Sequence, residues 1–332
     1  MTLGYRPLPQ SGTARPSGAV PLVGTNLWFN YVEVLECGRT PEIISAQDLP
    51  AGVAARLTAP REPLAGLDMN QPNIMGILNT TPDSFSDGGV HAGVEAAVQG
   101  ARAMVAAGAT ILDVGGESTR PGASFVPHDQ EIARTAPVIA AIRAETQTAI
   151  SIDTRKAQVA QAAVTAGATI VNDVSGFTFD ADLAPVCANL PVPVCVMHAQ
   201  GDPATMQNDP RYEDVVLDVY RFLEAQVTRL VALGLRRGQI IVDPGLGFGK
   251  TQDHNLTLLK NLSVFHGLGC PILLGASRKR FIGTIGQEPQ ADARAPGSIA
   301  VALAAAAQGA QILRVHDVAE TAQALRLWQA VR

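Results

Sequence analysis

The stretch "AGATILDVGG" (107–116) recurs in altered form as "AGATIVNDVSG" (166–176), and this repeat decides the expected fold. In both copies a glycine ends an alanine-rich stretch of helical periodicity and precedes a short apolar run. Glycine just past the last apolar turn is typical of a helix C-terminus, and a short run of Ile, Leu and Val is typical of a buried strand. The repeat therefore predicts helices that alternate with strands of a parallel sheet.

The same alternation continues from Asn73 to the C-terminus. Eight strand-like runs lie at 73–79, 110–116, 149–154, 169–175, 193–198, 240–245, 271–277 and 311–317. Helical segments such as 93–108 and 212–234 lie between them. Eight strand–helix units over roughly 260 residues predict an α/β protein with a (β/α)8 TIM barrel. A doubly wound open sheet is the alternative, because periodicity does not show that a barrel closes.

Residues 1–72 differ from the barrel region, because they are rich in Pro and Gly. They contain one strand-like stretch at 27–36 and a weak helical segment at 49–66. We expect 1–72 to be an N-terminal extension packed on a barrel formed by 73–332. The function of the extension does not follow from its sequence.

Composition narrows the class of protein. The chain has 47% hydrophobic and 17% charged residues and a formal net charge of −5, which predict a globular protein with a large core and no nucleic-acid or membrane partner. The N-terminus lacks the pattern of a signal peptide and no apolar run reaches ~20 residues, so we expect a cytoplasmic protein. The four cysteines form no CxxC pair, so we expect reduced thiols and no zinc site.

Most of the apolar runs become polar at their C-terminal ends. The residues are Asn79, Asp113, Asp153, Asn172, His198, Asp243, Ser277 and His316. One such residue is commonly a helix cap, but eight in register favour a shared site, since the carboxyl ends of barrel strands converge on one face. Neighbours on a strand face opposite ways, so we expect Asn172 to point into the barrel mouth and Asp173 to be a hydrogen-bonded support.

Several loops carry residues suited to an anionic or flat ligand. "GASRKRFIG" (275–283) places Arg278, Lys279 and Arg280 at a helix start, where the dipole disfavours cations unless they have another role. In "RVHD" (314–317), Arg314 and His316 share one face of a strand and suit a phosphate or diphosphate.

The stretch "DPGLGFGKT" (243–251) nearly matches a phosphate-binding Walker A loop. Pro244 stands where that motif needs its first Gly, and Pro has no N–H to offer a phosphate, so we reject a nucleotide hydrolase. The three glycines that follow predict a sharp bend around a flat ligand, on which Phe248 can stack.

Together the motifs resemble those of the dihydropteroate synthase family of pterin-binding TIM barrels. The motifs are "ILNTTPDSFSDGG", "ILDVGGESTRPGA", "SIDT", "NDVSG", "DPGLGFGK", "LLGASRKRFIG" and "RVHD", in unbroken order over 74–318. The resemblance implies a transferase of folate biosynthesis that condenses 6-hydroxymethyl-7,8-dihydropterin diphosphate with 4-aminobenzoate. The products are 7,8-dihydropteroate and pyrophosphate, and the resemblance further implies Mg²⁺ and a homodimer.

The resemblance also implies roles for individual residues. The pterin-binding positions are Asp153, Asn172, Met197, Asp243 and Lys279, and Asp113 is a further substrate-binding position. The diphosphate positions are Asn79, Arg314 and His316, with Asn79 also at the metal. The aminobenzoate and loop-closure positions are Asp83, Ser84, Phe85, Thr119, Arg120, Pro121, Phe248 and Ser277. Asp83, Arg120 and Lys279 are the expected catalytic residues. Ala199 departs from the family pattern, in which a second Met is common.

Two related functions are alternatives. A pterin-binding methyltransferase barrel would use methyltetrahydrofolate and a corrinoid partner, but would have no use for "STRPG", "SRK" and "RVH". A non-catalytic pterin-binding paralogue would be expected to lack Asn79, the first loop or Arg314, all of which are present. The unmodified "DSFSDGG" resembles the sulfonamide-sensitive form of the enzyme.

Overall fold

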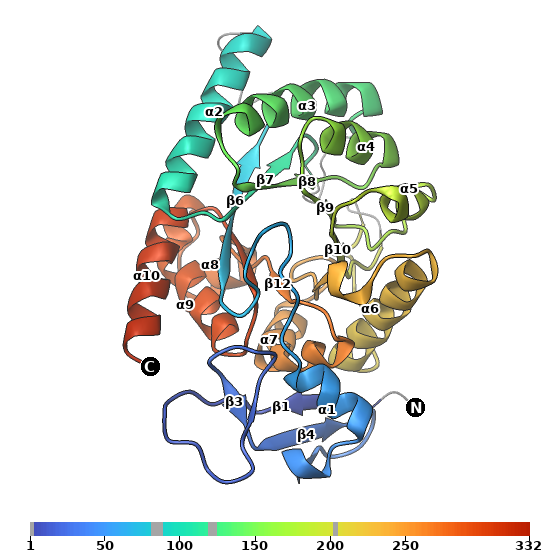
Figure 1. Cartoon of the computed structure of the whole chain (residues 1–332), viewed down its shortest axis with the longest axis vertical. Coiled ribbons are helices and arrows are strands. Elements are labelled where there is room, and N and C mark those ends of the chain that lie inside the picture. Colours follow the sequence, from blue (N-terminus) through green and yellow to red (C-terminus); the bar gives the residue numbers. More distant parts are fainter. Residues whose placement is uncertain (1–2, 81–88, 119–124, 202–204) are drawn as a thin grey trace.

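The computed structural model describes residues 3–80, 89–118, 125–201 and 205–332, and Figure 1 shows their arrangement. One sheet of the described chain has eight strands, all parallel, in the order β11-β10-β9-β8-β7-β6-β13-β12. The strands are β6 (Asn73–Asn79), β7 (Ile111–Gly115), β8 (Ala149–Asp153), β9 (Ile170–Asp173), β10 (Val194–Met197), β11 (Ile240–Asp243), β12 (Leu273–Leu274) and β13 (Ile312–Val315). A parallel bridge between Val242 and Ile272 joins the two ends of this order. The sheet is thus a closed barrel, and the open-sheet alternative is wrong.

Helices surround the barrel and connect its strands (Figure 1). They are α2 (Gly89–Ala107), α3 (His128–Glu145), α4 (Ala157–Thr165), α5 (Leu183–Asn189), α6 (Val215–Ala232), α7 (Gln252–Lys260), α8 (Arg280–Ile285), α9 (Ala295–Ala306) and α10 (Val318–Ala330), with short 3-10 turns η3 (Arg237–Gln239), η4 (Leu262–Leu268) and η5 (Asp292–Arg294). The expected helices at 93–108 and 212–234 correspond to α2 and α6. None of the helices in the described residues is long and apolar enough to cross a membrane.

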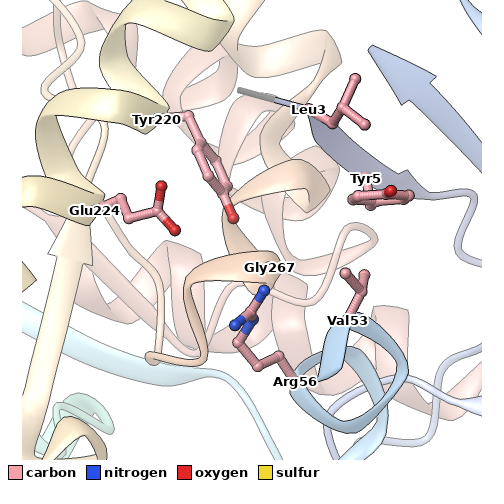
Figure 2. Close-up of a pocket in the computed structure, with 7 residues that line it drawn as sticks. All are labelled: Leu3, Tyr5, Val53, Arg56, Tyr220, Glu224 and Gly267. Carbon is pink, nitrogen blue, oxygen red and sulfur yellow. The ribbon is translucent and has the colours of Figure 1, made fainter. Parts of the chain in front are cut away.

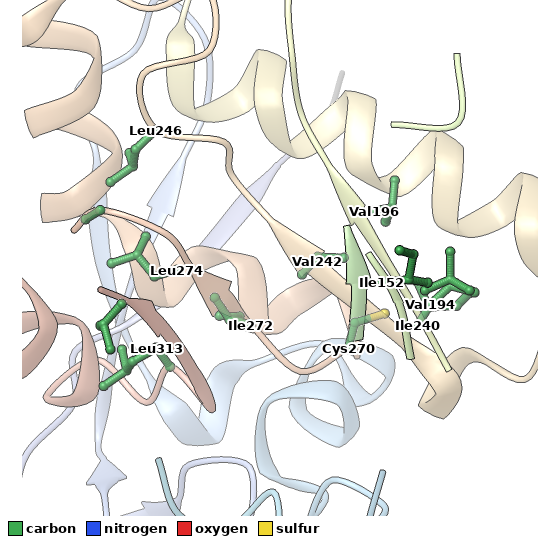
Figure 3. Packing of buried hydrophobic residues seen from close by; sticks show 14 of the residues in the cluster. Ile152, Val194, Val196, Ile240, Val242, Leu246, Cys270, Ile272, Leu274 and Leu313 are labelled. Carbon is green, nitrogen blue, oxygen red and sulfur yellow. The ribbon is translucent and has the colours of Figure 1, made fainter. Parts of the chain in front are cut away.

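The barrel interior has an apolar layer near the amino ends of the strands. Each strand contributes one buried side chain to it: Met75, Ile111, Ala149, Ile170, Cys195, Ile241, Leu273 and Ile312. Leu64 and Met69, from the segment before β6, pack against this layer and close the barrel floor. The alternate residues, among them Ile152, Val242 and Leu313, pack against the helices (Figure 3).

Strand alternation then determines which side chains reach the barrel mouth. Two residues beyond the apolar layer, the interior face carries Asp113 on β7, Asn172 on β9, Asp243 on β11 and Arg314 on β13. Asp173 has the opposite parity, so it faces outward. The sequence pattern therefore places a polar ring on an apolar floor, at the end of the barrel where (β/α)8 enzymes bind substrate.

The first 72 residues are more structured than their sequence indicated. They contain β1 (Gly4–Pro7), β2 (Val20–Pro21), β3 (Trp28–Phe29), β4 (Tyr31–Leu35), β5 (Glu42–Ser45), η1 (Ala46–Asp48) and α1 (Ala51–Thr58). β1, β4 and β5 form an antiparallel sheet, and Leu22, Phe29 and Leu57 belong to a buried cluster beside it. Ser263 Oγ of η4 donates to the Pro7 carbonyl at 2.8 Å, so the sheet is tied to the barrel.

Candidate active site

A buried ion network connects strands β7, β8 and β13 at the barrel mouth. Arg314 Nε donates to Asp113 Oδ2 at 2.6 Å, and Arg314 Nη2 donates to Asp153 Oδ2 at 2.7 Å. Asn172 Nδ2 on β9 lies 3.4 Å from both oxygens of Asp113. Asp113 is fully buried, whereas the Arg314 side chain is 23% exposed. Four predicted site residues thus form one cluster that opens toward the mouth.

The charges of this cluster shift its acid–base properties. Burial raises the pKa of Asp153 to about 7, although the positive charge of Arg314 opposes the shift. Burial alone would lower the pKa of Arg314, but Asp113 and Asp153 outweigh it and raise that pKa. The guanidinium therefore stays charged, while Asp153 titrates near neutral pH.

Asp243 and Lys279 form the second part of the site. Asp243 Oδ1 accepts from the Gly245 N–H at 2.7 Å, whereas Asp243 Oδ2 accepts no hydrogen bond from the described residues. Burial raises the pKa of Asp243, with Lys279 opposing the shift. Lys279 Nζ donates to the Leu246 carbonyl and lies 4.7 Å from the centre of the Phe248 ring. Burial lowers the pKa of Lys279 to about 8, so this amine is still mostly protonated at pH 7 and titrates just above it.

The glycine-rich loop after β11 passes directly over the end of β10. Gly245 has φ +68°, and a Cβ there would lie 1.9 Å from the His198 carbonyl oxygen, so only glycine fits. The predicted bend at Gly245 is confirmed.

Lys250 joins this glycine-rich loop to the end of β10, and the sequence alone did not identify it as a site residue. Its buried Nζ contacts His198 Nδ1 at 2.8 Å and donates to the carbonyls of His198 and Phe248 at 3.3 and 3.0 Å. Burial lowers the pKa of Lys250 well below its ordinary value and that of His198 to about 2. The lysine of the Walker-like motif thus points into the protein and supports a loop.

The two polar neighbours on β9 have different surroundings. Asp173 Oδ1 accepts from the Ser175 N–H at 2.8 Å and from Ser175 Oγ at 2.7 Å, and its second oxygen accepts from the Phe177 N–H. The expectation that Asp173 is a hydrogen-bonded support is confirmed, and it organises the turn that follows Asn172.

Of the three cations in "SRKR", only Lys279 lies in the site. Arg278 donates from Nε to Asp317 Oδ2 at 3.2 Å and also pairs with Asp317 Oδ1, and Arg280 is exposed at the start of α8. The expectation that all three serve a ligand is therefore wrong, because Asp317, the N-cap residue of α10, pairs with Arg278. Ser277 Oγ lies 3.0 Å from His316 Nδ1, which brings these two predicted residues together.

A second buried ion network holds the residues on either side of 119–124. Lys156 Nζ donates to Glu131 Oε2 at 2.6 Å and to the Val126 carbonyl at 2.5 Å, and it lies 3.1 Å from Glu117 Oε1. Glu117 Oε1 in turn accepts from the Val126 N–H at 2.9 Å. Of these residues only Glu117 lies in one of the family motifs, "ILDVGGESTRPGA", and its sequence position alone indicated no role.

The predicted residues Asp83, Ser84, Phe85, Thr119, Arg120 and Pro121 lie outside the described residues. Asn79, at the end of β6, is exposed, and its amide makes no hydrogen bond to the described part of the chain. Met197 is buried on the interior face of β10. The described members of the predicted site thus all lie at the carboxyl ends of the strands or in the loops that follow them.

Comparison with known proteins agrees with this geometry. Residues 75–316 match the family model described as pterin binding enzyme. The dihydropteroate synthase of Escherichia coli strain K12 is 46% identical over 264 residues, which are 80% of this chain and 93% of the relative. That of Synechocystis is 47% identical over 258 residues, covering 78% of this chain and 89% of the relative.

Solved structures give the same result. The Yersinia pestis dihydropteroate synthase with a sulfonamide drug complex superposes with a TM-score of 0.77 at 43% identity, over 82% of this chain and 99% of that one. The Xanthomonas albilineans enzyme in complex with 7,8-dihydropteroate gives a TM-score of 0.74 at 43% identity, over 82% and 98%. The chain therefore belongs to the pterin-binding enzyme family, among the dihydropteroate synthases.

Proposed function

We propose that the polar ring at the barrel mouth is where this transferase joins the dihydropterin to 4-aminobenzoate. The overall reaction condenses 6-hydroxymethyl-7,8-dihydropterin diphosphate with 4-aminobenzoate and releases pyrophosphate and 7,8-dihydropteroate. The observation that carries the proposal is the buried Asp243, whose Oδ2 has no partner among the described residues and whose face of the barrel also carries Asn172 and Arg314.

The pterin edge fits the hydrogen-bonding capacity of this face. The 2-amino-4-oxo edge offers adjacent N–H donors, and a carboxylate accepts two such donors. Asp243 takes that role, while Asn172 both donates and accepts, as the mixed edge of the ring requires. Asp153 accepts a further ring N–H, and Met197 and the Lys279 stem enclose the flat ring.

The diphosphate has its partners on the other side of the mouth. Arg314 uses two of its five N–H groups on Asp113 and Asp153, so its remaining donors and its 23% exposed surface are left for an anion. His316 and Asn79 complete this group. Asp113 holds the guanidinium in place.

Mg²⁺ fits this end of the site. It prefers oxygen ligands and keeps several waters when it binds a phosphorylated substrate. A Cβ built on Gly115 would lie 4.0 Å from Asn79 Oδ1 and 3.9 Å from Asp153 Oδ2, so both oxygens flank the same glycine. Asn79 would hold the ion together with diphosphate oxygens, and the bound ion would neutralise the leaving group's charge.

The chemical step is a substitution at the exocyclic CH₂. The amine nitrogen of 4-aminobenzoate forms the new C–N bond, the C–O bond breaks, and pyrophosphate leaves with the electron pair, while the amine loses a proton. No protein nucleophile is needed, because the electron-rich pterin stabilises positive charge at this carbon. Asp83, Ser84, Phe85, Thr119, Arg120, Pro121, Phe248 and Ser277 remain the predicted aminobenzoate and loop positions, with Asp83, Arg120 and Lys279 acting on the reaction.

We further propose a cytoplasmic homodimer. Ile285 on α8 and Leu327 and Val331 near the C-terminus are large apolar side chains that are 53%, 66% and 74% exposed. A second copy of the chain would cover such surface. Light scattering of the purified protein at two concentrations would measure the mass and test this.

The proposed reaction is tested by measuring pyrophosphate release from the purified chain. Release should require both substrates and Mg²⁺, and it should yield 7,8-dihydropteroate in equal amount. Release at the full rate without 4-aminobenzoate would show a hydrolase instead. Methyl transfer from methyltetrahydrofolate would favour the methyltransferase alternative.

A further inference from the structure

A cavity of about 260 Å³ lies outside the barrel, between the N-terminal extension and helix α6. The extension contributes Leu3, Tyr5, Val53 and Arg56, and α6 contributes Tyr220 and Glu224. Figure 2 shows the Tyr220 hydroxyl, the Arg56 guanidinium and the Glu224 carboxylate directed toward the same space, with Leu3, Tyr5 and Val53 on one side of it. None of these residues belongs to the site at the barrel mouth.

Two polar groups of this cavity have no hydrogen-bond partner among the described residues. Tyr220 is 5% exposed, and its hydroxyl makes no hydrogen bond to the described residues. Arg56 Nε is buried, and no hydrogen-bond partner for it exists within the described part of the chain. Buried polar groups are nearly always satisfied by protein, water or ligand, so these two atoms indicate an occupant that the protein itself does not supply.

Two opposite charges also remain apart across this space. The pKa of Tyr220 is raised to about 12, chiefly by burial and in addition by the charge of Glu224, whereas the charge of Arg56 opposes the shift, so both charges act on the phenol. Yet no ion pair joins Arg56 to Glu224 within the described chain. A molecule with a carboxylate at one end and an ammonium group nearby would satisfy both charges at once.

We propose that this cavity binds a free α-amino acid with an apolar or aromatic side chain. The carboxylate pairs with Arg56 and accepts from the Tyr220 hydroxyl, and the ammonium pairs with Glu224. The side chain packs on Leu3, Tyr5 and Val53. Because the ligand bridges the extension and α6, its binding stabilises the extension on the barrel.

Isothermal titration of the full chain with three probes tests the proposal. L-phenylalanine carries both charges, 3-phenylpropionate lacks the ammonium, and phenethylamine lacks the carboxylate. We expect saturable binding of L-phenylalanine, at least about tenfold tighter than either of the other two, because each lost charge leaves a protein charge unpaired.

Variants separate the two ends of the ligand. Arg56→Met should weaken the binding of L-phenylalanine at least about tenfold and leave the affinity for phenethylamine unchanged. Glu224→Gln should weaken the binding of L-phenylalanine and leave the affinity for 3-phenylpropionate unchanged. Arg326→Met, on the exposed face of α10, is the matched control and should change nothing. Unchanged pyrophosphate release by all three variants would show that they fold. Absence of saturable binding by every probe, or L-phenylalanine affinity unaffected by Arg56→Met and Glu224→Gln, would overturn the proposal and leave water as the occupant.

Discussion

Replacing Arg314 by methionine removes the guanidinium that joins Asp113 to Asp153 while keeping most of the side-chain length. Two carboxylates, one of them fully buried, then lose a charged partner at 2.6 and 2.7 Å. Removing one partner of a buried ion pair costs roughly 3–5 kcal/mol of folding free energy. Because the Arg314 side chain is 23% exposed, we expect the lower end, about 3 kcal/mol at pH 8.

The stability lost in Arg314→Met should increase as the pH rises. The pKa of Asp153 is about 7 in the fold, above its ordinary 3.8, so its protonation favours the folded state below 3.8 and this contribution is lost as the pH rises through about 7. Without Arg314 the folded pKa moves higher still, because the opposing cation is gone. Above pH 7 the free energy of unfolding of the variant should therefore fall by up to about 1.4 kcal/mol per pH unit more than that of the parent.

Urea unfolding followed by circular dichroism at pH 5.5, 7 and 8 measures this difference. The difference in the free energy of unfolding between parent and variant should be smallest at pH 5.5 and largest at pH 8. Adding Asp113→Asn to the variant should recover part of the loss, because one uncompensated charge is removed. A pH-independent loss below about 1 kcal/mol, the size expected of a surface ion pair, would refute the reasoning.

Three further substitutions test the supports of the site. Lys250→Met removes the donor to His198 and Phe248, and should raise KM for 4-aminobenzoate more than KM for the dihydropterin diphosphate; equal rises would contradict the proposed place of Phe248. Asp173→Ala leaves three donors without their acceptor and should cost about 2–4 kcal/mol in urea unfolding, whereas a cost under about 0.5 kcal/mol would exclude a supporting role. Gly245→Ala would place a Cβ 1.9 Å from the His198 carbonyl oxygen and should weaken the binding of a pterin analogue in titration. Gly52→Ala is its control, because a Cβ at Gly52 meets nothing within 4 Å. Equal affinities of the two variants would count against the close approach of the Gly245 loop to β10.

Local patterns were sufficient to predict the alternation of strands and helices and which strand residues face the barrel mouth, whereas closure of the barrel is decided by the bridge between Val242 and Ile272. The strand-like runs at 73–79 and 149–154 coincide closely with β6 and β8, because buried parallel strands are short, apolar and bounded by polar loop residues. Period-two alternation then separates Asn172 from Asp173 without knowledge of the tertiary structure.

Partners distant in the chain could not be predicted in this way. Arg314 pairs with Asp113, 201 residues away, and this pairing depends on which strands become neighbours after the barrel closes. The charge run 278–280 was misread, because Asp317, 39 positions further along the chain, neutralises Arg278. Lys250 resembled a phosphate ligand by motif, but its buried contacts make it a support.

The extension was underestimated for a different reason. Its strands have two to five residues, which is too short for periodicity to be recognised, and its core forms only when they assemble. The role of Leu64 and Met69 in closing the barrel floor likewise appears only once the eight strands have assembled the interior cluster to which both residues belong.

The central claim is that Asp243 at the barrel mouth binds the pterin, and titration of 6-hydroxymethyl-7,8-dihydropterin diphosphate into the parent and Asp243→Asn tests it most directly. Asparagine keeps an oxygen for the Gly245 N–H, which Asp243 Oδ1 accepts at 2.7 Å, so the loop and the urea midpoint should be retained. It cannot accept two pterin donors, so the affinity should fall at least about tenfold. Equal affinity of the parent and the variant would contradict the account.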